Sequence, residues 1–231
     1  MTRTIVVIQA RLGSRRFPEK MLADLGGRPL IEWVVVRVRR SSLVDRVVVA
    51  TTTESLDDRL VNECKRLNVE VRRGPADDVL RRFVEAVTND PADSVVRVCA
   101  DNPFVDPACI DLAIKEFRAR GAEYVYNHRP LNVCDYADGF GVEVVGRELL
   151  ERLDNLQLSQ AHREHVTLAI ADGTVTAAIY GCPAPPELAR PELRFDVDEP
   201  EDLDRLRKLV QQGAVTPESS ARDVIKAADS L

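Results

Sequence analysis

Apolar residues change between strand-like and helix-like spacing along the first hundred residues. Short runs rich in β-branched residues, bounded by polar residues, predict strands at 4–8, 47–50, 69–71 and 94–98. Between these runs, apolar residues recur at helical spacing in the segments 30–38, 57–67 and 78–87. This alternation is typical of a parallel sheet covered by helices, so we expect an α/β domain.

The pattern becomes less regular after a further predicted helix at 106–120. Strands predicted at 123–126 and 141–145 enclose a long polar stretch without helical spacing, which predicts a mixed sheet or a lid. The later predicted elements are helices at 148–153 and 163–171, a strand at 175–180, a proline-rich loop at 183–191, a strand at 194–198 and a helix from 199 to about 210.

The loop after the first predicted strand contains the most distinctive group of side chains. Residues 9–20 read Gln-Ala-Arg-Leu-Gly-Ser-Arg-Arg-Phe-Pro-Glu-Lys. Gly13 and Ser14 let the backbone approach an anion closely, and neutralising charge comes from Arg11, Arg15, Arg16 and Lys20. The spacing is neither that of a P-loop nor that of a dinucleotide fold. We therefore predict a nucleoside triphosphate site, with a solvated polar connection as the alternative.

Carboxylates follow two of the predicted strands. Asp101 comes just after the fourth strand, and Asp196 and Asp198 share one face of the strand predicted near the C-terminus. Because Mg²⁺ binds carboxylates together with phosphate oxygens and waters, both motifs are candidate metal sites. Each also has an alternative role, in which Asp101 or Asp198 is the N-cap of the helix that follows it.

Composition and charge narrow the function classes. A formal net charge of −6 over 231 residues and a pI near 5.3 argue against general binding to nucleic acid or to membrane surfaces. The 5 cysteines form no Cys-x-x-Cys pair, and the 3 histidines form no metal-ligand cluster with them. No apolar run approaches the ~18 residues of a membrane span, and no secretory signal is present, so we expect a cytoplasmic protein. Motifs for acyl transfer and zinc hydrolysis are missing, which leaves nucleotidyl or glycosyl transfer.

Several blocks, in chain order, together resemble one enzyme family, the cytidylyltransferases of spore coat polysaccharide biosynthesis protein F, related to the enzymes that make CMP-activated acidic sugars. The blocks are residues 9–22, 26–31, 48–52, 73–80, 97–103, 138–144, 163–167 and 196–202. The resemblance implies a Rossmann-like, GT-A-like nucleotidyltransferase fold. Such a fold is a three-layer α/β sandwich with a mainly parallel sheet and a small irregular β-rich lid or dimerisation segment.

The resemblance also implies how one domain, residues 1–231, is divided. Residues 1–122 would form the CTP-binding half, 123–193 an acceptor-binding or lid segment, and 194–231 a metal-binding strand end with C-terminal helices. Asp101 and Asp198 would hold Mg²⁺. The expected catalytic residues are Lys20, Arg11 and Arg15. The expected nucleotide-binding residues are Ala10, Arg11, Gly13, Ser14, Arg15, Lys20, Thr51, Thr52, Asp77 and Ala100, and the expected acceptor-binding residues are Asn127, Asp138, Glu143, Arg163 and His165.

The implied reaction is attack of an acceptor oxygen on the α-phosphorus of CTP, which forms a CMP conjugate and releases pyrophosphate. A hydroxyl acceptor needs a general base, whereas a phosphate or phosphonate oxygen is already ionised. No residue stands out as that base, which favours an anionic phosphorus acceptor. The resemblance to acidic-sugar enzymes keeps an acidic sugar as the other expected anionic acceptor. The chain departs from the family pattern at two places, with Ala100 in place of Gly and Phe140-Gly141 in place of Leu-Asp. The second departure lies in the expected acceptor region and leaves acceptor identity open.

Two other interpretations of the sequence, and one of the assembly, remain. A nucleotide-sugar-dependent glycosyltransferase would be expected to have Asp-x-Asp after the fourth strand, where this chain has Asp101-Asn-Pro. A non-catalytic nucleotide-binding subunit would be expected to have lost one of the loop cations or carboxylates. On the predicted helix, Arg163 and His165 have a structural or solvated role as the alternative to acceptor binding. Relatives often pair through the irregular segment, so a homodimer is a further expectation.

Overall fold

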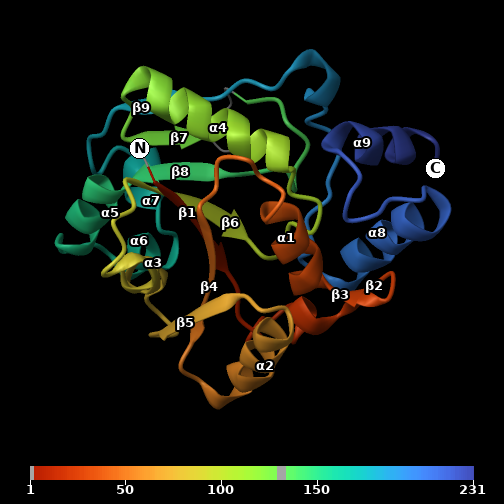
Figure 1. The fold of residues 1–231 in the computed structure, drawn as a ribbon, viewed down its shortest axis with the longest axis horizontal. Coiled ribbons are helices and arrows are strands. Elements are labelled where there is room, and N and C mark those ends of the chain that lie inside the picture. Colours follow the sequence, from red (N-terminus) through yellow and green to blue (C-terminus); the bar gives the residue numbers. More distant parts are fainter. Residues whose placement is uncertain (1–2, 129–133) are drawn as a thin grey trace.

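The computed structural model describes residues 3–128 and 134–231. A seven-stranded sheet in the order β5-β4-β1-β6-β8-β7-β9 forms its centre (Figure 1). The strands are β1 (Thr4–Gln9), β4 (Arg46–Thr52), β5 (Glu70–Gly74), β6 (Ser94–Cys99), β7 (Tyr124–Tyr126), β8 (Glu143–Gly146) and β9 (Ile179–Gly181). β8 is antiparallel to both of its neighbours, and the other neighbouring pairs are parallel. The sheet is therefore mainly parallel, as predicted.

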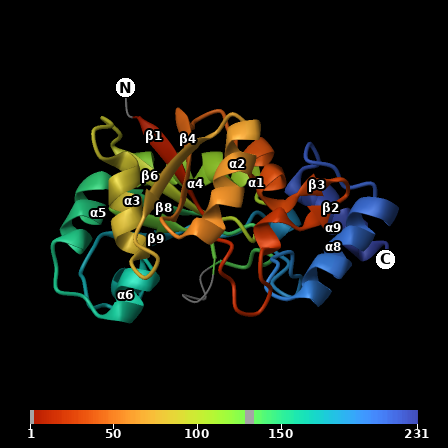
Figure 2. The ribbon, with the colours of Figure 1, turned by 90° about the horizontal axis from the view of Figure 1, so that it is seen from below.

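Helices cover both faces of the sheet and give three layers (Figures 1 and 2). Alternate residues of β1 belong to different apolar clusters. Val6 and Ile8 pack in the cluster that contains helices α1, α2 and α4, whereas Ile5 and Val7 pack in the cluster that contains α3 and α5. These helices are α1 (Leu30–Val38), α2 (Asp58–Arg66), α3 (Val79–Val87), α4 (Pro107–Arg120) and α5 (Arg147–Asp154). Burial on both faces explains why β1 is a continuous apolar run.

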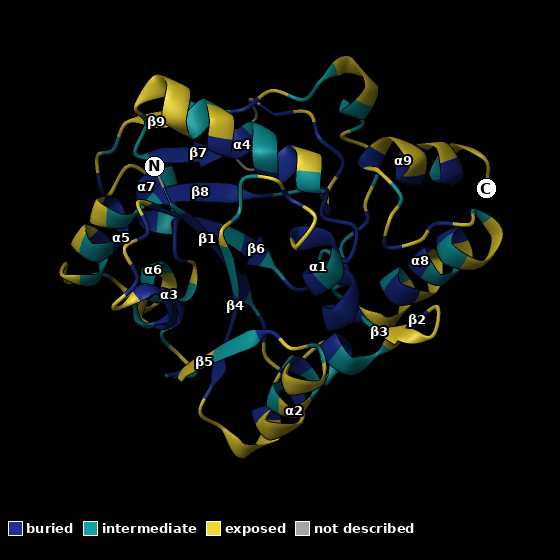
Figure 3. Cartoon of the chain, viewed as in Figure 1, coloured by how far each residue is buried: buried dark blue, intermediate teal, exposed yellow. Residues whose placement is uncertain are grey.

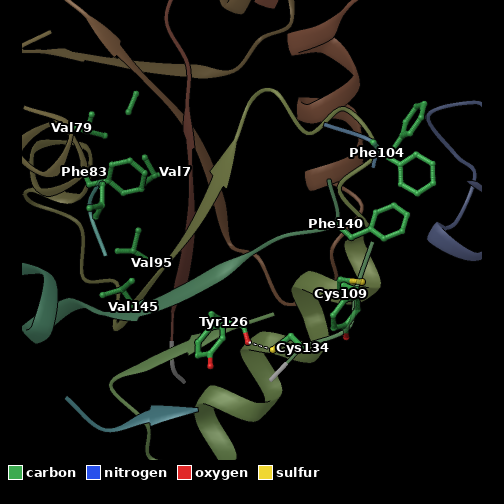
Figure 4. Packing of buried hydrophobic residues seen from close by; sticks show 14 of the residues in the cluster. Val7, Val79, Phe83, Val95, Phe104, Cys109, Tyr126, Cys134, Phe140 and Val145 are labelled. Atoms are coloured by element: carbon green, nitrogen blue, oxygen red, sulfur yellow. Dashed lines mark hydrogen bonds between the residues drawn. The ribbon is translucent and has the colours of Figure 1, made fainter. Parts of the chain in front are cut away.

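The interior on both sides of the sheet is mainly apolar. Figure 3 shows buried residues along the central strands and exposed residues on the outer sides of α2 and α4. In Figure 4, Phe83 of α3 lies against Val7 of β1, with Val95 and Val145 of the next strands close by. Burying a Phe side chain of this kind stabilises the fold by roughly 1.5–3 kcal/mol.

Sequence features explain where the principal helices begin and end. The Asp106 side chain caps α4 by accepting a hydrogen bond from the Ala108 N–H, and Gly121 ends that helix in the left-handed region with φ 59°. Asp78 caps α3 by accepting from the Arg81 N–H. The C-terminal helices are α8 (Pro200–Gln212) and α9 (Ala221–Asp229), and both begin with a capping box.

Three predicted elements differ from the structure. The segment 194–198 is not a strand. Its backbone bonds to two loops, since the Phe195 N–H donates to the Asp138 carbonyl and the Val197 N–H donates to the Asp101 carbonyl. The helix predicted at 163–171 is two short helices, α6 (Gln160–Glu164) and α7 (Leu168–Ala171), and Thr167 between them donates a hydrogen bond to the buried Glu143 carboxylate. The predicted strand at 175–180 pairs with β7 from residue 179 onward.

Smaller elements complete the molecule. A hairpin of β2 (Asp24–Leu25) and β3 (Arg28–Pro29) packs beside α8. Among the described residues, 3-10 turns span Lys20–Leu22, Ser55–Asp57 and Pro186–Leu188, the last within the predicted proline-rich loop. No helix in the described part of the chain is long and apolar enough to cross a membrane.

Candidate active site

The loops that follow β1, β4 and β6 leave the same edge of the sheet, because these strands are parallel neighbours. Ligands of open α/β sheets bind outside the carboxyl ends of the strands. The chain that enters α8 reaches the same side of the molecule as the loop after β1 (Figure 2). This edge therefore brings together segments that are almost two hundred residues apart in the sequence.

A cluster of opposite charges lies at this edge. The Lys20 ammonium nitrogen is 3.1 Å from Asp101 Oδ2 and 3.5 Å from Asp198 Oδ1, and it donates a hydrogen bond of 2.6 Å to the Val197 carbonyl oxygen. The Lys20 residue is 7% exposed. Arg16 Nη2 lies 3.0 Å from Asp198 Oδ1 on the solvent side. Three oxygen atoms from two loops thus converge on one cation.

Neither carboxylate is a helix cap. Asp106 provides the cap of α4, and Glu199 together with Asp202 forms the capping box of α8. This geometry excludes the N-cap alternative for Asp101 and for Asp198. Two carboxylates beside a carbonyl oxygen form the oxygen-only donor set that suits a hard cation such as Mg²⁺.

Asp196 does not join this cluster, although the predicted strand would have placed it on the same face as Asp198. Its carboxylate pairs with Arg194 at 2.7 Å and is 13% exposed. Phe195 and Val197, on either side of it in the sequence, are buried in the core. The two acidic residues therefore have separate partners.

The loop after β1 leaves several of its polar groups accessible. Arg11, Gly13 and Arg15 are exposed, and a Cβ atom built on Gly13 would meet no atom within 4 Å. Arg11 Nη1 is 3.3 Å from the Ala76 carbonyl oxygen and Arg11 Nη2 is 3.5 Å from a Glu164 carboxylate oxygen. Arg15 makes no hydrogen bond or ion pair with another residue that the structure describes. The loop thus has open space and two accessible guanidinium groups for an anion.

Asp57 fixes this loop to the end of β4, a role that the sequence analysis missed. Its side chain accepts from the Leu12 N–H at 2.7 Å, from the Thr51 hydroxyl at 2.8 Å and from the Thr52 N–H at 3.0 Å. The Thr52 hydroxyl also donates to it, and Asp57 is 1% exposed. The hydroxyls of both predicted nucleotide-binding threonines therefore face this carboxylate.

The other predicted nucleotide-binding residues lie around the same edge. The Ala10 N–H donates to the Ala50 carbonyl and the Ala100 N–H donates to the Gln9 carbonyl, so both alanines continue the sheet pairing beyond their strands. The Ser14 hydroxyl accepts from the Phe17 N–H at 3.3 Å and shapes the turn. Asp77 lies in the loop before α3, where its carbonyl oxygen accepts from Gln160 Nε2.

A pocket of about 160 Å³ lies near Asp101, between β6, β8 and the segment around Asp138. It is lined by Arg97, Cys99, Asn102, His128, Asp138, Gly141, Val142 and Glu143. Asp138 is half-exposed there, and partial burial together with the neighbouring Asp196 raises its pKa. Two of the predicted acceptor-binding residues, Asp138 and Glu143, thus line one pocket.

Glu143 is the buried centre of this pocket. It begins β8 opposite Arg97 of β6 and forms an ion pair with it. Glu143 Oε1 also accepts from the Tyr124 hydroxyl at 2.5 Å and the Thr167 hydroxyl at 2.6 Å, and it lies 3.1 Å from His128 Nε2. Burial by itself would raise the pKa of Glu143, but Arg97, His128 and these hydrogen bonds hold it well below its usual value.

The remaining predicted acceptor-binding residues lie outside the lining of this pocket. Asn127 is 1% exposed and bonds to backbone at both ends, donating to the Phe140 carbonyl and accepting from the Val142 N–H. The Arg163 guanidinium lies between Asp78 and Asp154. His165 is exposed at the end of α6. Among these three, Asn127 supports the pocket wall from behind.

Packing explains the departure from the family pattern at 140–141. Phe140 is fully buried, with its ring centroid 5.2 Å from that of Phe195. A Cβ atom on Gly141 would come within 3.1 Å of His128 Cβ. The two residues thus fill the core on one side and leave room for His128 at the pocket on the other.

The chain is similar over most of its length to known cytidylyltransferases. A family model described as cytidylyltransferase matches residues 5–221. The spore coat polysaccharide biosynthesis protein SpsF of Bacillus subtilis (strain 168) is 33% identical over 231 residues, covering 97% of this chain and 93% of the relative. A 3-deoxy-manno-octulosonate cytidylyltransferase of Anaeromyxobacter sp. (strain Fw109-5) is 31% identical, covering 92% and 99%. A solved cytidylyltransferase structure from Leptospira borgpetersenii has a TM-score of 0.91 at 27% identity, covering 100% of this chain and 95% of that one.

These findings confirm the resemblance drawn from the sequence blocks and the predicted Rossmann-like nucleotidyltransferase fold. They favour nucleotidyl transfer over the glycosyltransferase and non-catalytic alternatives. The family model covers both the loop after β1 and the chain that enters α8, and therefore every residue of the charge cluster. The chain belongs to the cytidylyltransferase family and is a nucleotidyltransferase.

Proposed function

We propose that this enzyme joins CMP from CTP to a small anionic acceptor, with release of pyrophosphate. The acceptor is an acidic sugar or a phosphonate or phosphate compound. Family membership supports the CTP and the cytidylyl transfer. The observation that carries the rest is the cation site at the sheet edge, where Asp101, Asp198 and the Val197 carbonyl converge beside a loop with exposed arginines.

In this proposal the loop after β1 binds the triphosphate. Arg11 and Arg15 are exposed and approach the phosphates from solvent, while the backbone around Gly13 and Ser14 comes close to them. Negative charge builds up on the leaving pyrophosphate, and Lys20 together with the two arginines stabilises it. Asp77 would lie at the rim of this site, and the buried residues Ala10, Ala100, Thr51 and Thr52 would form its packed base. The threonines act as support, because both hydroxyls and the Thr52 N–H already bond to Asp57.

Asp101 and Asp198 would hold the Mg²⁺ that accompanies CTP. When bound, the ion neutralises charge on the phosphate oxygens and orients them for in-line displacement. The two carboxylates belong to different loops, so their placement relative to each other depends on the backbone bond from the Val197 N–H to the Asp101 carbonyl, 2.9 Å long. The chain's own contribution is therefore the geometry of a cation site beside the phosphate loop.

The acceptor would lie in the pocket lined by Asp138 and Glu143. An ionised phosphate or carboxylate oxygen needs only placement, whereas a sugar hydroxyl must lose a proton. The raised pKa of Asp138 suits it to accept that proton, so the structure adds a candidate base that the sequence did not reveal. The name of the octulosonate-specific relative favours an acidic sugar as the first acceptor to test.

The test begins with thermal unfolding in the presence of CTP, UTP, ATP, GTP or UDP-sugars, each with and without Mg²⁺. A ligand at 100 times its Kd adds about 2.7 kcal/mol of stability, which raises the Tm visibly. We expect selective stabilisation by CTP with Mg²⁺, followed by pyrophosphate release when acidic sugars or phosphonates are added. A response to UDP-sugars alone, or to none of the nucleotides, would contradict the proposal.

A further inference from the structure

We propose that the Lys20 ammonium and the divalent cation are alternative occupants of one oxygen site. The metal then binds tightly when a bound nucleotide offers phosphate oxygens to the displaced Lys20. It binds weakly when no nucleotide is bound. This inference rests on the proposed function for the identity of the metal ligands. It adds that the metal and the nucleotide bind together.

The first step is that Lys20 already occupies one oxygen of each carboxylate that a metal ion would use. Lys20 Nζ contacts Asp101 Oδ2 at 3.1 Å, Asp198 Oδ1 at 3.5 Å and the Val197 carbonyl oxygen at 2.6 Å. A Mg²⁺ ion bound to carboxylate oxygens lies about 2.0–2.1 Å from them. An ion bound to these carboxylate oxygens would therefore lie against the ammonium group of a residue that is only 7% exposed.

The second step concerns charge. The carboxylates of Asp101 and Asp198 carry two negative charges, and Lys20 and Arg16 already balance them. Bringing a doubly charged ion to the same oxygens while the ammonium stays would place like charges in contact inside a partly buried site, where screening is weak. The ion and the ammonium therefore exclude each other.

The third step is where Lys20 goes. Its side chain has a flexible four-carbon stem with three N–H donors, so the head group can move without moving the backbone. Without a nucleotide, a displaced Lys20 has to move into solvent from a site that gave it three oxygen partners. With a triphosphate bound at the adjoining loop, it exchanges carboxylate oxygens for phosphate oxygens. Binding of metal and nucleotide is then cooperative, because each favours the same position of Lys20.

The test is a titration of nucleotide-free protein with Mn²⁺, followed through the electron paramagnetic resonance signal of the free ion. We expect Lys20→Met to bind Mn²⁺ at least tenfold more tightly than the wild type. Arg16→Met removes a cation from the same Asp198, but its side chain is 60% exposed, so the gain should stay below that of Lys20→Met. Lys115→Met, on an exposed face of α4, changes the net charge equally and should leave Mn²⁺ affinity within threefold of the wild type.

A second measurement uses the wild type and decides the question even if Lys20→Met does not fold. The rate at which an amine-acylating reagent modifies Lys20 is followed by peptide mass spectrometry with and without saturating Mn²⁺. Expulsion of the ammonium predicts faster modification with Mn²⁺, with Lys115 as the internal reference. An unchanged Lys20 rate, or no gain in affinity for a folded Lys20→Met, would overturn the inference.

The outcomes separate this inference from the function on which it rests. If the wild type binds no Mn²⁺ even with CTP, the proposed metal site is wrong. If the wild type binds Mn²⁺ with CTP and Asp101→Asn abolishes that binding, the metal site stands. In that case the Lys20→Met titration tests only whether Lys20 and the metal ion exchange at the carboxylates.

Discussion

The nucleotide side of the site and the acceptor side are supported by different amounts of regular structure. The nucleotide side rests on parallel strands of 5–7 residues, each followed by a helix or a helical turn. The acceptor side rests on strands of 3 or 4 residues and, among the described residues, on the segments 134–142 and 189–199, which contain no helix or named strand (Figure 1). Yet each side has one buried carboxylate that ties its loops together, Asp57 on the first and Glu143 on the second.

The two carboxylates differ in the charge of their partners. Asp57 accepts hydrogen bonds from backbone N–H groups and threonine hydroxyls, all of them neutral. Glu143 pairs with the Arg97 guanidinium, which is 15% exposed, in addition to its hydroxyl donors. Regular structure already positions the nucleotide loops, so neutral hydrogen bonds complete them. The acceptor side, with little regular structure, depends on an ion pair.

The largest expected effect comes from breaking that ion pair. Glu143→Gln leaves the Arg97 charge buried without its partner, and breaking a buried pair in this way costs about 3–5 kcal/mol. Urea unfolding at neutral pH measures the loss, with the exposed Glu148→Gln as the control. In steady-state kinetics the KM for the acceptor should rise more than the KM for CTP. Equal changes in both constants would show that the two sides are not supported separately.

The same variant carries a pH signature. Because the pKa of Glu143 is held well below its usual value in the folded protein, its ionised form contributes stability above the unfolded pKa of about 4.3 and loses it as the pH falls further. We therefore expect the stability difference between the wild type and Glu143→Gln to shrink between pH 5 and pH 3. A difference that stays constant over this range would argue against the ion pair as its cause.

The next expected effect concerns chemistry rather than support. Lys20→Ala should lower the turnover number about a hundredfold, or about 3 kcal/mol in the barrier, by analogy with the loss of one oxyanion donor. The exposed Lys115→Ala should leave turnover unchanged. Pyrophosphate release under saturating CTP measures both. Intact turnover in Lys20→Ala would remove this residue from the catalytic group.

On the nucleotide side, Asp57→Asn gives the counterpart to Glu143→Gln. Asparagine offers one accepting oxygen to four donors, so at least one buried N–H loses its partner, at a cost of about 1–3 kcal/mol. The KM for CTP should rise several-fold while the KM for the acceptor changes less, the reverse of the Glu143 variant. Asp58→Asn is the matched control, since this neighbour is 59% exposed. Loss of stability without a change in the KM for CTP would limit Asp57 to folding.

The contrast between Asp57 and Asp58 also shows what the sequence could not predict. Periodicity predicted the strands and helices of the first half closely, because a buried parallel strand and an amphipathic helix each have a distinct apolar spacing. The two adjacent aspartates look alike in the sequence. One is buried because the threonines and the Leu12 N–H surround it, which is a tertiary arrangement.

The same reasoning explains the error near the C-terminus. Alternation in 194–198 resembles a strand, and its apolar residues Phe195 and Val197 are buried in the structure. Its hydrogen-bond partners, however, are the loops at Asp101 and Asp138, and a partner elsewhere in the chain leaves no local signal. The family resemblance, and not periodicity, paired Asp101 with Asp198, and both carboxylates lie within 3.5 Å of the Lys20 ammonium nitrogen.

The smallest expected effect tests the boundary between the two sides. Arg163 joins them, since its guanidinium contacts Asp78 at the start of α3 and Asp154 at the end of α5. The side chain is 20% exposed, so Arg163→Gln should cost about 1 kcal/mol in urea unfolding. If Arg163 only links the two sides, both KM values stay within about twofold of the wild type. Arg163 belongs neither to the loop after β1 nor to the lining of the pocket around Glu143. If it binds the acceptor, as the family resemblance implies, the acceptor KM rises alone, and the acceptor side would then extend beyond the pocket around Glu143 to α6.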